Sequence, residues 1–97
     1  MVKHVLLIKL KDNSTKTCEE VKKVLLSMEG KVEMIRELSV GIDFLHSGRS
    51  YDVALEVGLD SREALVAYQQ DPYHVDVVKA FIQERKESTV VVDYETE

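Results

Sequence analysis

The sequence has no tryptophan, one cysteine, one proline and four glycines among its 97 residues. A single cysteine, Cys18, excludes an internal disulfide, and this is typical of a protein from a reducing compartment. The apolar run from Val5 to Ile8 is too short for a secretion signal or a membrane span. These absences predict a cytoplasmic protein that has no membrane partner.

Positive charge is also scarce, since the formal net charge at pH 7 is -5. A protein that binds a phosphate backbone needs clustered lysine and arginine side chains. Near the start of the chain, Lys3, Lys9 and Lys11 are instead separated by apolar residues. No pair of histidines or cysteines has the spacing of a zinc site. The sequence therefore predicts neither a nucleic-acid partner nor a metal site.

What the sequence does have is the composition of a globular chain, with 44% hydrophobic and 32% charged residues. Its length predicts a single domain over residues 1–97. A chain this short buries only about 60–65% of its unfolded surface, so association with a second copy would add stability.

Apolar periodicity predicts six elements. The expected strands cover residues 2–10, 34–44, 50–59 and 88–95. The first helix is expected to have a capping box at Thr17 and Glu20 and to end at Gly30. The second helical region is expected to start at Asp60 or Ser61.

The only proline divides that second helical region. The residue before a proline avoids helical backbone angles, so Asp71-Pro72 is expected to end the first segment. The same pair can open the next segment, with Asp71 as its N-cap and Pro72 in its first turn. That segment is expected to end near Arg85. Its expected buried residues are Val75, Val78, Phe81 and Ile82.

This βαββαβ order predicts an α+β ferredoxin-like plait, in which a four-stranded antiparallel sheet carries its helices on one face. The other face would be bare, yet it includes Val5, Leu7 and Ala54. A half-apolar bare face is typical of an interface. We therefore expect a symmetric homodimer that associates through the sheet face.

Three polar side chains are predicted to face the space between sheet and helices. His4 alternates with the apolar residues of the first strand, and His74 shares a helical face with Val78 and Phe81. A neutral imidazole can accept a proton at pH 7, and a tyrosine phenol such as that of Tyr68 can donate a hydrogen bond to an oxyanion. Convergence of such groups in an apolar cleft is typical of a small-molecule site.

Four segments in this order carry a family resemblance: "VKHVLLIKLKD", "SYDVALEVGLDS", "YQQDPYHV" and "VVVDYE". Together they make the chain similar to the stress-responsive dimeric α/β-barrel family, often called Dabb. The resemblance implies a homodimer whose two sheets form a barrel with the helices outside. Most members of that family have no assigned activity.

Plant polyketide cyclases of this family close a linear chain by an aldol condensation, without a metal or an organic cofactor. The resemblance implies His74 and Tyr68 as the catalytic pair, and it implies no cofactor. It also implies substrate contacts from the cleft at His4 and Val53, and Phe81 is expected to join them. Two positions depart from the cyclase pattern, because Asp71 and Val53 stand where those enzymes have histidines.

Several functions remain open at this point. One is cofactor-free acid-base chemistry on a carbonyl substrate, of the cyclase or lyase type. A second is a stress-related dimer that binds a ligand without turnover, or that has only a structural role, with His74 and Tyr68 packing or capping the helix junction. A third, monooxygenase activity, rests on fold analogy alone.

Overall fold

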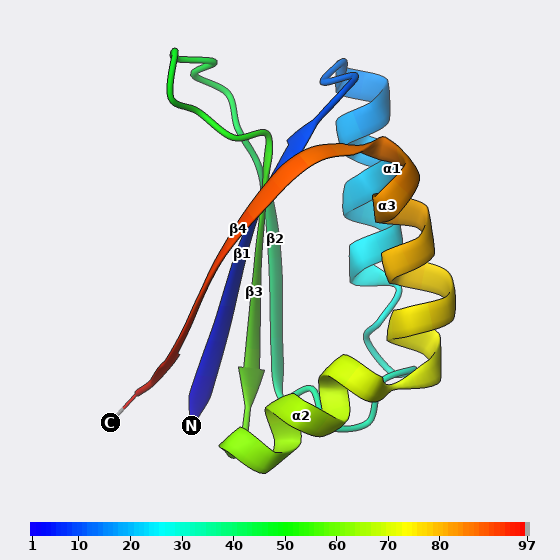
Figure 1. Cartoon of the computed structure of the whole chain (residues 1–97), viewed down its shortest axis with the longest axis vertical. Helices are drawn as coiled ribbons and strands as arrows, with labels where there is room; N and C mark the ends of the chain where they lie inside the picture. Colours follow the sequence, from blue (N-terminus) through cyan, green and yellow to red (C-terminus); the bar gives the residue numbers. More distant parts are fainter. Residues whose placement is uncertain (97) are drawn as a thin grey trace.

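One four-stranded sheet packs against a layer of helices in the computed structural model, which describes residues 1–96 (Figure 1). The elements in chain order are β1 (Val2–Leu10), α1 (Thr15–Leu26), β2 (Glu37–Ile42), β3 (Val53–Leu59), α2 (Arg62–Gln70), the π-helical turn η1 (His74–Lys79), α3 (Ala80–Arg85) and β4 (Lys86–Glu95). This confirms the predicted ferredoxin-like α+β fold. No helix within residues 1–96 is long and apolar enough to cross a membrane.

The strands lie in the order β2-β3-β1-β4, and each neighbouring pair is antiparallel. His4 of β1 stands opposite Val57 on one side and Asp93 on the other. Because successive side chains of a strand point to opposite faces, His4, Val57 and Asp93 share a face. Buried His4 and fully buried Val57 place that face under the helices.

The first helix begins earlier than its predicted capping box. The Ser14 side chain accepts a hydrogen bond from the Thr17 N–H at 3.3 Å, so Ser14 is the N-cap and the prediction of Thr17 is wrong. The predicted strand at residues 34–44 is also too long, since β2 ends at Ile42. Phe44 lies beyond it and is 89% exposed, because the chain turns away from the sheet there.

The Asp71-Pro72 break is confirmed. Asp71 has extended backbone angles and ends α2. Its Oδ1 accepts hydrogen bonds from the N–H groups of Tyr73 at 2.9 Å and His74 at 3.2 Å, which caps the next helical segment.

That next segment is not the uniform α-helix that was expected. Its first part is the π-helical turn η1, in which backbone bonds span five residues rather than four. Val78 and Ile82 are buried as expected, whereas Val75 is exposed and the prediction of its burial is wrong.

A buried carboxylate connects the start of β3 to the end of β1. Asp52 is 6% exposed and accepts hydrogen bonds from the Leu10 N–H at 2.8 Å and the Asn13 amide at 3.3 Å. We expect Asp52→Ala to lower the free energy of unfolding by about 2–3 kcal/mol, because it leaves a buried N–H without its acceptor. Urea denaturation measures this change. The exposed carboxylate Asp76 provides the matched control Asp76→Ala, and equal losses in the two variants would contradict the assignment.

The second face of the sheet carries no helix in the described chain (Figure 1). It presents an apolar group, here called the open-face patch, which lies mostly on β1 and β4. Its members are Val5, Leu7, Ala54, Val90, Val92 and Tyr94. Three of these, Val90, Val92 and Tyr94, are 46%, 62% and 47% exposed, so the patch is accessible to a partner.

Candidate functional site

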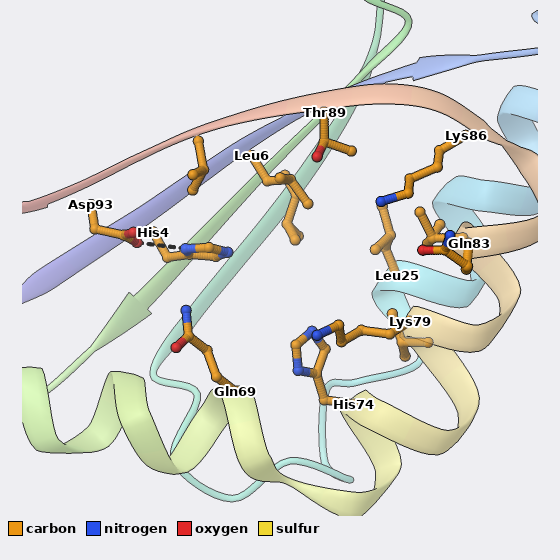
Figure 2. Close-up of a pocket in the computed structure, with 14 residues that line it drawn as sticks. His4, Leu6, Leu25, Gln69, His74, Lys79, Gln83, Lys86, Thr89 and Asp93 are labelled. Atoms are coloured by element: carbon orange, nitrogen blue, oxygen red, sulfur yellow. Dashed lines mark hydrogen bonds and ion pairs between the residues drawn. The ribbon is translucent and has the colours of Figure 1, made fainter.

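A cavity of about 420 Å³ lies between the sheet and the helical layer (Figure 2). Its polar lining comes from β1, β4 and the helical segments, and its apolar lining comes from the core. The lining residues are His4, Leu6, Leu25, Leu55, Gln69, His74, Val78, Lys79, Ile82, Gln83, Lys86, Thr89, Val91 and Asp93. The cavity is large enough for a small organic molecule.

His74 is held with one ring nitrogen turned toward the protein. Its Nδ1 lies 3.0 Å from the Tyr68 carbonyl oxygen. A carbonyl oxygen only accepts hydrogen bonds, so Nδ1 must carry the proton and donate it. In the neutral ring, Nε2 is then an unprotonated base, and the ring reaches into the cavity (Figure 2).

The pKa of His74 also favours its role as a base. Its pKa lies below the ordinary value of 6.5, chiefly because the ring is partly buried. The hydrogen bond to the Tyr68 carbonyl opposes this effect, while the positive charge of Lys79 adds to it. The imidazole is therefore neutral at pH 7 and able to accept a proton.

A titration tests this protonation state. We expect the ring proton signals of His74 to titrate with a midpoint below 6.5, because burial penalises the imidazolium. The cation should appear only as the pH falls through that lowered value. Proton NMR follows the titration, and the signals missing from His74→Gln identify the residue. A midpoint above 6.5 would contradict the geometry described here.

The second cavity histidine pairs with a carboxylate across two strands. His4 Nδ1 lies 2.5 Å from Asp93 Oδ1, and the two residues are direct partners in the β1–β4 register. A carboxylate on Nδ1 fixes the ring orientation and keeps a proton on that nitrogen. Nε2 of His4 can then accept a hydrogen bond when the ring is neutral, or donate one when it is protonated.

Tyr68 lies behind both histidines. Its ring stacks on His74 with centroids 4.2 Å apart and is tilted against His4 at 5.6 Å. The side chain is fully buried, and its hydroxyl lies 3.9 Å from the Met28 sulfur rather than among the cavity-lining groups. Burial raises the pKa of Tyr68, so the phenol stays neutral.

The structure thus brings the predicted residues His4, Tyr68 and His74 together, but it places two others away from the cavity lining. Val53 stands opposite Ile8, four positions along β3 from Val57, the partner of His4, and it is buried there. Phe81 lies against the Arg85 guanidinium, 3.5 Å from the ring centroid, and the next residue, Ile82, lines the cavity.

Sequence reasoning missed six polar groups of the cavity lining. They are Gln69, Lys79, Gln83, Lys86, Thr89 and Asp93. Alternation along β4 places Thr89, Val91 and Asp93 on one face, and antiparallel pairing with β1 sets that face beside Ile8, Leu6 and His4. A register derived from the predicted sheet was the signal that could have identified Asp93.

Other reactive side chains do not form a site. Within residues 1–96, no three histidine, cysteine, aspartate or glutamate side chains gather as metal ligands. Cys18 is buried, and burial raises the pKa of its thiol, so the thiolate nucleophile is disfavoured.

The chain is thus a small ferredoxin-like protein with a cavity between sheet and helices that is lined by two histidines. Among such proteins, the chain belongs to the family described as the stress responsive A/B barrel domain, or Dabb, whose sequence profile matches residues 2–96. No sequence among the curated proteins matches this chain.

Solved structures with similar folds include two at more than 25% identity. A dimeric ferredoxin-like protein of unknown function from Bacteroides fragilis is 29% identical, with a TM-score of 0.83 over 98% of this chain and 95% of that one. A protein of Arabidopsis thaliana is 27% identical, with a TM-score of 0.85 over 100% and 96% of the two chains. The hydroxynitrile lyase of Passiflora edulis is 18% identical, with a TM-score of 0.82 over 99% and 93%, a similarity of fold.

Proposed function

We propose that this protein is a cofactor-free acid-base enzyme that removes a proton from the carbon next to a carbonyl group of a small molecule. The observation that carries the proposal is the orientation of His74. Its Nδ1–H is committed to the Tyr68 carbonyl, and its Nε2 lone pair remains available in a partly apolar cavity. A base with a pKa below neutrality is unprotonated at physiological pH, as this step requires.

The proposed step uses His74 and a neighbouring group of the cavity lining. Nε2 of His74 takes the proton from the α-carbon, and the C–H electron pair forms an enolate whose charge rests on the carbonyl oxygen. The side-chain amide of Gln69, which lines the same cavity, can donate a hydrogen bond to that oxygen. Return of a proton to carbon, or attack of the enolate on a second carbonyl group, completes an isomerisation or an aldol-type closure.

Tyr68 has two possible roles in this proposal. With its hydroxyl against Met28, it acts as a positioning residue whose ring packs against both imidazoles. The role expected from the family resemblance, a phenol that holds the oxyanion, requires the hydroxyl to leave Met28. That role stays a prediction, which the Tyr68→Phe variant tests.

We also propose that the working form is a homodimer that associates through the open-face patch and acts in the cytoplasm. The similar proteins from Bacteroides fragilis and Thermobifida fusca are described as dimeric. In this chain, the exposed valines of β4 support the proposal, because a monomer gains nothing from presenting them to water.

Deuterium exchange tests the chemistry without knowledge of the natural substrate. The protein is incubated in D₂O with a panel of methyl ketones that includes para-acetylbenzoate, and loss of the methyl proton signal is followed by NMR. The proposal expects exchange faster than in buffer that contains free imidazole. Selective binding of panel compounds with no exchange would support the alternative, a ligand-binding protein without turnover.

A further inference from the structure

Two lysines from opposite ends of α3 meet at the same cavity. Lys79 ends the π-helical turn and Lys86 begins β4, so the six-residue helix between them separates the two in sequence. Both line the cavity, and Figure 2 shows the Lys86 ammonium directed into it and the Lys79 chain running toward the His74 ring. Lys79 follows His74 by five positions. In a π-helix, residues five apart lie close to the same face, so Lys79 and His74 are near neighbours on the helix surface.

The described residues do not hold these two ammonium groups in ion pairs. Neither Lys79 nor Lys86 forms an ion pair within residues 1–96, whereas Lys3, Arg36 and Arg62 each pair with a carboxylate. The one carboxylate in the cavity lining, Asp93, is hydrogen-bonded to His4. The cavity is therefore locally positive in a chain whose net charge is -5.

We propose that Lys79 and Lys86 form an anion subsite, and that the substrate is a small carbonyl compound bearing a carboxylate. That the carbonyl group is the part of the substrate that reacts rests on the proposed function. With neutral histidines, two ammonium groups and Asp93 leave one uncompensated positive charge. A carboxylate balances that charge, whereas a phosphate dianion exceeds it. Apolar side chains, including Leu6, Leu55 and Val91, form the surface for the body of the ligand.

Two ligands of nearly the same shape, one charged and one neutral, show how much the ligand's negative charge contributes to binding. para-Acetylbenzoate and its neutral amide, para-acetylbenzamide, differ in the anionic group and share the aryl ketone. We expect the acid to bind about 10-fold more tightly than the amide, because the two ammonium groups attract the carboxylate and have no such attraction to the neutral amide. Raising the salt concentration from about 50 to about 500 mM should weaken binding of the acid alone. Titration calorimetry measures both affinities.

Lysine variants test whether the preference for the acid depends on Lys79 and Lys86. We expect the double variant Lys79→Gln, Lys86→Gln to bind the acid no better than the amide while its affinity for the amide stays unchanged. Lys31→Gln removes an exposed lysine outside the cavity and should keep the preference for the acid. Circular dichroism shows that each variant is folded.

Three results would overturn the subsite: equal binding of acid and amide by the wild type, a preference that survives the double variant, or tighter binding of phenyl phosphate than of the acid. The exchange assay separates this inference from the proposed function. Lysine-dependent binding of the acid without α-proton exchange would refute the enzyme and keep the subsite. Equal exchange of acid and amide would refute the subsite and keep the enzyme.

Discussion

The His74→Gln variant should lose α-proton exchange by about 10²–10⁴-fold, the usual contribution of a positioned general base. Glutamine can keep a hydrogen bond to the Tyr68 carbonyl, as the imidazole does through Nδ1, but an amide is not a base at neutral pH. Binding of para-acetylbenzoate should change little, because the loss concerns proton transfer. The rate of exchange by NMR and the affinity by calorimetry measure the two effects separately.

His46→Gln is the matched control. His46 lies in the exposed loop between β2 and β3, away from the cavity lining, so this variant should exchange at the wild-type rate. The wild-type rate should also rise with pH through the lowered pKa of His74 and level off once the imidazole is neutral, since only the neutral imidazole is a base. Full activity in His74→Gln would exclude His74 as the base.

Tyr68→Phe distinguishes the two roles of that tyrosine. If the ring positions the histidines, phenylalanine preserves the stacking and most of the exchange activity remains. If the hydroxyl holds the enolate oxygen, activity falls as far as in His74→Gln and the affinity for the ketone stays the same. The fold survives either way, because the weak contact with Met28 is the only hydrogen bond of this hydroxyl within residues 1–96.

The second large effect concerns assembly. Val92→Glu should raise the dissociation constant of the proposed homodimer by at least about 10²-fold, because two-fold symmetry would place two unpaired carboxylates in the proposed apolar interface. Val92 is 62% exposed in the single chain, so the substitution removes little packing within one copy. Analytical ultracentrifugation over a concentration series measures the constant, and circular dichroism checks the fold.

Val66→Glu makes the same chemical change on α2, where the side chain is 53% exposed and lies outside the open-face patch. It should leave dimerisation unchanged. A dimer that tolerates Val92→Glu but not Val66→Glu would place the interface on the helical side. A wild-type chain that stays monomeric at all accessible concentrations would refute the proposed assembly.

Local pattern was enough to predict the architecture and part of the site. Strand alternation placed His4 on the helix side, and the Asp71-Pro72 pair indicated the break that precedes His74, because both signals depend on residues near one another in the chain. The structure confirms both positions. Within the segment "YQQDPYHV", Asp71 therefore caps the next helical segment, and His74 lies in the cavity lining.

Tertiary structure decided the remainder. The pairing of His4 with Asp93 joins side chains 89 positions apart, and only the β1–β4 register brings them together. Of the two neighbours Phe81 and Ile82, both expected to face inward, only Ile82 lines the cavity, and Lys79 lines it as well. Burial also turned the Tyr68 hydroxyl toward Met28. Local sequence predicts which face a residue occupies, but contacts between distant elements determine what that residue meets there.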